Sequence, residues 1–174
     1  MRRVKREIIP AITPADVAQA RELFLEYAAE SKLDLCFQGF EEELAALPGK
    51  YAPPRGRLLL VREGQVAAGC GALRELSEGV CEMKRLFIQP AFRGNGFGKL
   101  LAEELVGEAR RIGYRAMRLD TLAPMRAALA LYESLGFRRI PAYYANPLPE
   151  VVYLELALQA EKKVSERSDE RRVH

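Results

Sequence analysis

The sequence predicts a mixed α/β domain with a mostly antiparallel sheet of six to seven strands and helices on both faces. Strand-like and helix-like segments follow one another in the order β-α-α-β-β-β-α-β-α-β-β. Each predicted helix carries one apolar stripe, which must be buried against the sheet. The chain has 174 residues, of which 49% are hydrophobic, enough for one core. We therefore expect a single domain over residues 1–158.

The N-terminal part supplies one strand and two helices. Residues 7–12 form a short β-like run, and Thr13 can cap the helix that follows. That helix is predicted from apolar residues at helical spacing, namely Val17, Ala20, Leu23, Phe24, Tyr27 and Ala28. Residues 31–40 show no period, and residues 41–47 indicate a second short helix that a Pro-Gly pair ends.

Three strands come next and form a meander. Residues 57–62 and 65–74 are β-like runs separated by Glu63-Gly64, a pair that suits a tight turn. They are expected to form an antiparallel hairpin, which residues 80–88 extend.

The second half of the chain alternates helices and strands. A helical stripe runs to Ile112 and ends at Gly113, a residue typical of C-terminal caps. Residues 116–120 predict a short central strand, and a further helix begins at Pro124 and ends at Gly136.

Two closing strands and a tail complete the chain. The strands are predicted over residues 137–140 and 151–158. Residues 159–174 are dense in both charges and lack aromatic side chains, so we expect a disordered, solvated tail.

Composition excludes several classes of protein. The net charge is +3 with both signs interspersed, which gives no support for a nucleic-acid partner. No apolar run approaches the ~20 residues of a membrane span, and no signal sequence is evident. Cys36, Cys70 and Cys81 are odd in number and widely spaced, so we expect no disulfide framework and a cytoplasmic location. The only histidine is His174, which argues against histidine relays and zinc sites.

A Gly-rich turn, residues 93–99, separates the apolar run of residues 83–88 from a predicted helix. Such a turn presents free N–H groups and the positive end of the helix dipole, an arrangement that suits phosphate. Its spacing does not match the dinucleotide fingerprint, and no Ser or Thr follows Lys99 as a nucleotide-triphosphate loop requires.

Two motifs in this order resemble the GNAT family of N-acetyltransferases. Arg93 begins an Arg-x-x-Gly-x-Gly motif, and Ala128 begins an A-x-x-L-Y-x-x-x-G-F segment that ends at Phe137. The resemblance implies the GNAT fold and acetyl-CoA as cosubstrate, with no metal. It places the cofactor on the backbone of Leu86, Phe87 and Ile88 and on the turn formed by Arg93, Gly94, Asn95, Gly96, Phe97, Gly98 and Lys99.

The resemblance also suggests two catalytic side chains. Tyr132 matches the family position that protonates the departing thiolate, and a phenol is still protonated at neutral pH. Glu82 is the candidate base, since it interrupts an apolar strand that faces the acceptor in related enzymes. The alternatives are a solvent-facing glutamate and one that pairs with Lys84 or Arg85. Met125 stands where many members carry an asparagine that contacts the cofactor, and Thr121 is a candidate to replace that contact.

The acceptor is predicted less closely. Rings of Phe37, Phe40, Tyr143 and Tyr144 could line an acceptor pocket, although core packing explains them equally well. Charged candidates near the amine are Asp34 and Glu41, and Asp120 ends the central strand beside the expected cleft.

The sequence thus predicts an acetyl-CoA-dependent N-acetyltransferase that acts on a small-molecule primary amine through a direct ternary complex, as a monomer or homodimer. The alternatives are transfer of another acyl group, modification of a protein amine, or an acyl-CoA sensor without turnover.

Overall fold

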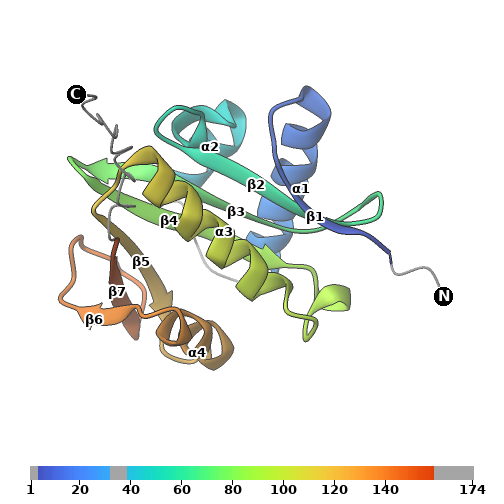
Figure 1. Cartoon of the computed structure of the whole chain (residues 1–174). Helices are drawn as coiled ribbons and strands as arrows, with labels where there is room; N and C mark the ends of the chain where they lie inside the picture. Colours follow the sequence, from blue (N-terminus) through green and yellow to red (C-terminus); the bar gives the residue numbers. More distant parts are fainter. Residues whose placement is uncertain (1–3, 32–38, 159–174) are drawn as a thin grey trace, which may run out of the picture.

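The computed structural model describes residues 4–31 and 39–158, and its elements follow the predicted order (Figure 1). The strands are β1 (Arg6–Pro10), β2 (Arg57–Glu63), β3 (Val66–Ser77), β4 (Val80–Ile88), β5 (Ala116–Leu122), β6 (Arg138–Ile140) and β7 (Val151–Ala157). The helices are α1 (Pro14–Ser31), α2 (Phe40–Ala46), α3 (Phe97–Ile112) and α4 (Arg126–Ser134), with the short 3₁₀ turns η2 (Gly49–Tyr51) and η3 (Pro90–Phe92).

The strands form one sheet in the order β1-β2-β3-β4-β5-β7-β6. Neighbouring strands are antiparallel except β4 and β5, which are parallel and are joined through α3. A parallel pair needs such a crossover. The antiparallel strands β2, β3 and β4 are joined by turns alone, whereas α1 and α2 lie between β1 and β2. The predicted mixed, mostly antiparallel sheet is confirmed.

Helices cover both faces of the sheet, as predicted (Figure 1). Alternation along β2 shows why: Leu59 and Val61 belong to the core under α3 and α4, whereas Leu58 and Leu60 belong to the core under α1 and α2. A strand that is buried on both faces must be apolar at every position, which explains its continuous run of leucine and valine.

Most predicted boundaries hold within two residues. The Thr13 hydroxyl accepts a hydrogen bond from the Asp16 N–H at 3.1 Å, and Gly113 caps α3 with φ of 105°. Two details were wrong. The hairpin turn lies one residue later, at Gly64-Gln65, and α4 begins at Arg126 because Pro124 and Met125 form a separate turn before it.

The strands β4 and β5 pair over only three residues and then diverge. Their register runs from Val80–Ala116 to Glu82–Arg118, although both strands continue beyond it. On its other side, β4 has a bulge where Gly71 of β3 faces both Arg85 and Leu86, and Arg85 adopts a left-handed φ of 59°. The bulge keeps Lys84 and Arg85 on the same face of the sheet. The divergence opens the sheet at its centre.

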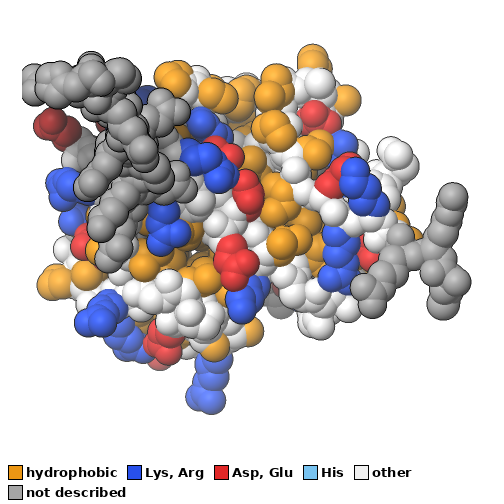
Figure 2. Space-filling model, in the orientation of Figure 1, with side chains coloured by type: hydrophobic (Ala, Val, Ile, Leu, Met, Phe, Trp, Pro, Cys, Tyr) orange, Lys and Arg blue, Asp and Glu red, His pale blue; other side chains and the backbone are white. Residues whose placement is uncertain are grey.

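The surface mixes charges of both signs. Figure 2 shows Lys, Arg, Asp and Glu side chains interspersed over one face. Within the described ranges, no helix has the length and apolar character needed to cross a membrane.

Candidate active site between β4 and β5

A cavity of about 820 Å³ lies where β4 and β5 diverge. Its walls come from β4, the end of β5, the Gly-rich turn, the start of α4 and the end of α1. Of the predicted site residues, the cavity is lined by Leu86, Phe87, Ile88, Arg93, Gly94, Gly96, Phe97, Gly98 and Tyr132. Asn95, Lys99 and Glu82 are not among the lining residues.

The Gly-rich turn leaves its amides free for a ligand. Among the described residues, no oxygen accepts a hydrogen bond from the N–H groups of residues 94–99, whereas Leu100 N–H already donates to Gly96 O. Gly94 and Gly96 have φ of 79° and 81°, a left-handed conformation that glycine adopts at little cost. The free amides and the start of α3 together suit an anion, and binding there stays a prediction.

The backbone of β4 is exposed toward the cavity. The Gln89 N–H donates to Ala68 O of β3, so strand alternation directs the polar groups of Leu86 and Ile88 to the open side. The Phe87 side chain packs on the α1 face against Tyr27, with ring centroids 6.1 Å apart. The expectation that residues 86–88 bind the cofactor through their main chain stays a prediction.

Side chains around the turn stabilise its shape. Arg93 Nε donates to Ile88 O at 2.9 Å, and its guanidinium pairs with Glu30 at 2.6 Å. The Asn95 amide donates to Phe92 O and Arg93 O, both at 3.2 Å. Lys99 points along α3, 3.9 Å from Glu103. Arg93 therefore links the turn to β4 and α1, while Asn95 closes the turn on itself.

Tyr132 lines the cavity from α4 and is buried. Its ring packs edge-on against Phe137, with centroids 5.7 Å apart, and burial raises the pKa of its hydroxyl. That hydroxyl has no hydrogen-bond partner among the described residues, so it is available to a ligand. The position suits the predicted donor.

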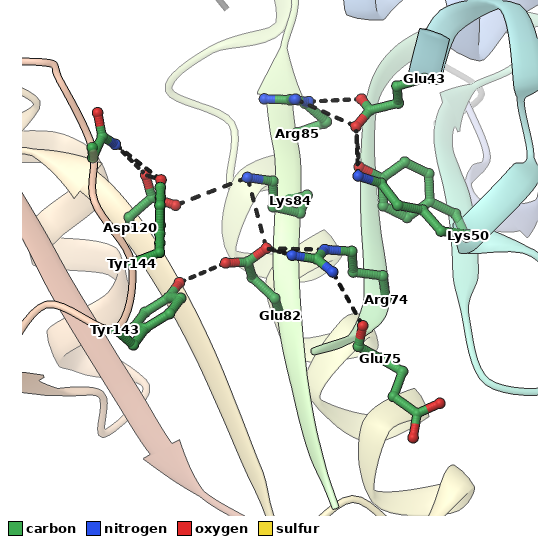
Figure 3. A network of polar contacts seen from close by, with 12 residues as sticks. Glu43, Lys50, Arg74, Glu75, Glu82, Lys84, Arg85, Asp120, Tyr143 and Tyr144 are labelled. Carbon is green, nitrogen blue, oxygen red and sulfur yellow. Dashed lines mark hydrogen bonds and ion pairs between the residues drawn. The ribbon is translucent and has the colours of Figure 1, made fainter. Parts of the chain in front are cut away.

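Glu82 lies beside the cavity at the centre of a polar network (Figure 3). It is only 1% exposed, accepts a hydrogen bond from the Tyr143 hydroxyl at 2.6 Å, and pairs with Arg74 at 3.0 Å. Lys84 Nζ lies 3.7 Å from its carboxylate. The pairing of Glu82 with Lys84, which was an alternative to a role as base, is present. The role of Glu82 as a base remains a prediction.

Asp120 does line the cavity, at the end of β5. Its Oδ2 accepts hydrogen bonds from the Tyr144 hydroxyl at 2.7 Å and from the Asn146 amide at 3.2 Å, and Lys84 Nζ lies 4.0 Å from Oδ1. Tyr143 and Tyr144 both come from the loop between β6 and β7. This loop holds the two carboxylates of the network through one tyrosine each.

Sequence reasoning missed Lys84 as a lining residue of the cavity. Burial lowers the pKa of its amine, and the nearby Glu82 carboxylate offsets part of that effect. The available signal was its position two residues after Glu82, which places both side chains on one face of β4.

The remaining candidates fall into three groups. Phe40 is buried in the core under α1, so packing explains it, and Glu41 is exposed on α2. Phe37 and Asp34 lie outside the described residues. Met125 lines the cavity, and its sulfur accepts a hydrogen bond from the Thr121 hydroxyl at 3.8 Å.

No cluster of metal-ligating side chains occurs in the part of the chain that the structure describes.

Known proteins resemble this chain over most of its length. Residues 17–137 match the Acetyltransferase (GNAT) family. An uncharacterized N-acetyltransferase of Schizosaccharomyces pombe is 42% identical over 147 residues, covering 83% of this chain and 90% of the relative. A Klebsiella pneumoniae structure assigned as an acyl-CoA N-acyltransferase has a TM-score of 0.65 and 29% identity, covering 89% of this chain and 97% of that one. The Salmonella typhimurium protein yncA, solved with its cofactor acetyl-CoA, has a TM-score of 0.68 and 20% identity, covering 90% and 96%.

Proposed function

Because the chain belongs to the GNAT family of acetyltransferases, we propose that it transfers an acetyl group from acetyl-CoA to the primary amine of a small molecule in a ternary complex. The observation that carries the proposal is the cavity between β4 and β5, which is lined by the Gly-rich turn with its free amides, by Tyr132, and by Asp120 and Lys84 of a network of charged side chains.

The residues present fit acetyl-CoA. Free amides of residues 94–99 suit the pyrophosphate, and the part of the β4 edge that does not pair with β5 suits the amide groups of the pantetheine arm, which can add to it like a strand. Acetyl-CoA supplies the activated acetyl group as a thioester. The matching S. typhimurium structure holds acetyl-CoA, which supports the same cosubstrate here.

This chain's own groups handle the protons. The amine nitrogen forms a bond to the acetyl carbon while the carbon–sulfur bond breaks, so the amine loses a proton and the thiolate gains one. Tyr132 is the donor to sulfur, because its side chain lines the cavity and its hydroxyl is protonated at neutral pH and has no hydrogen-bond partner among the described residues. Glu82 receives the amine proton through water, since Tyr143 and Arg74 surround its carboxylate.

A direct transfer is preferred to a route through an acyl group on either of the two cysteines that the structure describes. Cys70 and Cys81 are buried and do not line the cavity, and burial raises the pKa of Cys81 to about 12. Their thiolates are therefore scarce at neutral pH.

These unpaired thiols also accord with a reducing compartment, and we place the protein in the cytoplasm on that basis.

A panel of primary amines tests the proposal. Purified protein is incubated with acetyl-CoA and each amine, and both free CoA and acetylated product are measured, the latter by mass spectrometry. Acetylation of a small amine supports the proposal. Turnover only with a longer acyl-CoA or only on protein amines would establish the corresponding alternative. Tight acetyl-CoA binding with no transfer to any amine would indicate a sensor.

A further inference from the structure

The structure also bears on the acceptor, an inference that rests on the function proposed above. We propose that the acceptor is an amino acid or a closely related zwitterion, with its ammonium group received by Asp120 and its carboxylate by Lys84. Both side chains line the cavity and come from facing walls, β5 and β4, where the two strands have separated.

Asp120 is oriented to receive a donor. Tyr144 and Asn146 both bond to Oδ2, which leaves Oδ1 as the oxygen that faces Lys84 (Figure 3). The two partners are themselves fixed, since Asn146 donates to the Tyr144 hydroxyl at 2.9 Å and Tyr153 donates to Tyr144 O at 3.0 Å. A carboxylate held this firmly presents one oxygen in a constant direction, as recognition of an ammonium group requires.

Lys84 is suited to a carboxylate. Its side chain is 9% exposed, and it lies 4.0 Å from Asp120 and 3.7 Å from Glu82, both at the long end of the range for ion pairs. Burial lowers its pKa, and the Glu82 carboxylate acts in the opposite direction. A ligand carboxylate beside Lys84 also favours the charged form of its amine.

The charged side chains on the two walls favour a ligand that carries both charges. Asp120 on β5 and Lys84 on β4 carry opposite charges, and both line the cavity. A zwitterion places an opposite charge beside one charged group on each wall.

Matched pairs of acceptors test the inference. Each of a set of L-amino acids is compared with the amine that lacks only its carboxylate, for example phenylalanine with phenethylamine. We expect the amino acid to have the higher kcat/KM by roughly 10- to 100-fold, the effect of one charge-assisted hydrogen bond. Titration calorimetry with CoA-saturated protein should show the same order of affinities without any turnover.

Two variants separate the roles of the two walls. Lys84→Met should remove most of the preference for the carboxylate by raising KM for the amino acid alone, and Lys84→Arg should restore it. Asp120→Asn should weaken both members of each pair, since both carry the ammonium group. Lys5→Met, at an exposed lysine, serves as the control. Melting curves and acetyl-CoA affinity of each variant confirm that it is folded.

Equal kcat/KM for amino acids and their matched amines would overturn the inference and leave the proposed acetyltransferase function intact. An equal loss for both ligands in Lys84→Met would overturn it as well, because Lys84 would then have a structural role only. Failure to acetylate any amine would instead contradict the proposed function on which the inference rests.

Discussion

At the residue scale, Tyr132 carries the most specific mechanistic claim. Tyr132→Phe removes only the hydroxyl, which has no hydrogen-bond partner among the described residues, so folding should change little. We expect kcat to fall by ~10²–10⁴-fold, the usual contribution of general-acid assistance, with acetyl-CoA affinity nearly constant. Tyr114→Phe is the matched control, because that tyrosine bonds to Arg55 O and does not line the cavity. A Tyr132→Phe enzyme with wild-type kcat would make Tyr132 a packing residue.

Arg93 and Lys99 differ in what they contact. Arg93 connects the turn to Ile88 O and Glu30, whereas the described contact of Lys99 is a distant pair with Glu103. Arg93→Ala should therefore raise the Kd for acetyl-CoA by roughly 10-fold or more, and Lys99→Ala should change it little. Calorimetric titration of both variants checks this. A larger effect from Lys99→Ala would reverse the assignment.

Single residues were predictable where a motif constrains their surroundings. The turn glycines and Tyr132 lie within motifs, and the structure places them on the cavity as expected. Lys84 was missed because its significance depends on β5, a strand more than thirty residues away along the chain. Access of the acceptor to the Glu82 carboxylate depends on the position of Tyr143, which no local pattern in the sequence predicts.

At the scale of elements, close contact between β3 and β4 depends on glycine. A Cβ at Gly69 would press against the Phe87 carbonyl oxygen, whereas a Cβ at Gly94 would meet nothing within 4 Å. Gly69→Ala should lower the free energy of unfolding by about 1–3 kcal/mol and disturb the edge of β4. Gly94→Ala should cost only ~1 kcal/mol, from its left-handed φ. Urea denaturation compares the two, and equal losses would contradict the packing argument.

A buried ion pair joins α2 to the bulge of β4. Arg85 Nε donates to Glu43 at 2.9 Å, and the Tyr51 hydroxyl donates to the same carboxylate at 2.8 Å. Burial acts to raise the pKa of Glu43, but its interactions with Arg85 and Tyr51 outweigh burial and hold the pKa below its ordinary value. A lowered folded pKa means that this stabilisation is complete above the unfolded value and is lost as pH falls through the folded one.

Glu43→Gln should therefore destabilise the protein by ~3 kcal/mol at neutral pH and flatten its loss of stability in acid. Urea denaturation between about pH 7 and pH 3 measures both effects. Glu41→Gln, at an exposed glutamate of the same helix, is the control. An unchanged acid profile in Glu43→Gln would assign the acid sensitivity to other carboxylates.

Elements were predicted better than their pairing. Apolar periodicity located all four helices and the meander, because each stripe must be buried whatever lies against it. The divergence of β4 from β5 was not predicted from periodicity, since it arises from the bulge at Arg85 and from the pairing of β5 with β7 along its whole length. These are tertiary features, and a two-residue period contains no information about which strand is the neighbour.

At the scale of the whole molecule, the fold places free backbone amides and a network of charged side chains on opposite sides of the opening between β4 and β5. The start of α3 and the turn amides lie on the side of the core under α3 and α4. The charged network of β4 and β5 lies on the other face of the sheet, which α1 and α2 partly cover. In the proposed reaction, an anionic cosubstrate and an amine approach from different sides and meet where the strands diverge, as a direct transfer requires.

Titration of the protein with acetyl-CoA, followed by calorimetry and by thermal melting, tests the central claim most directly. Binding to the folded state alone at 100 times Kd should add about 2.7 kcal/mol of stability and raise Tm visibly. Gly96→Val, which places a branched side chain at a left-handed position in the turn, should weaken the binding. An unchanged Tm at saturating acetyl-CoA, together with no heat of binding, would contradict the account.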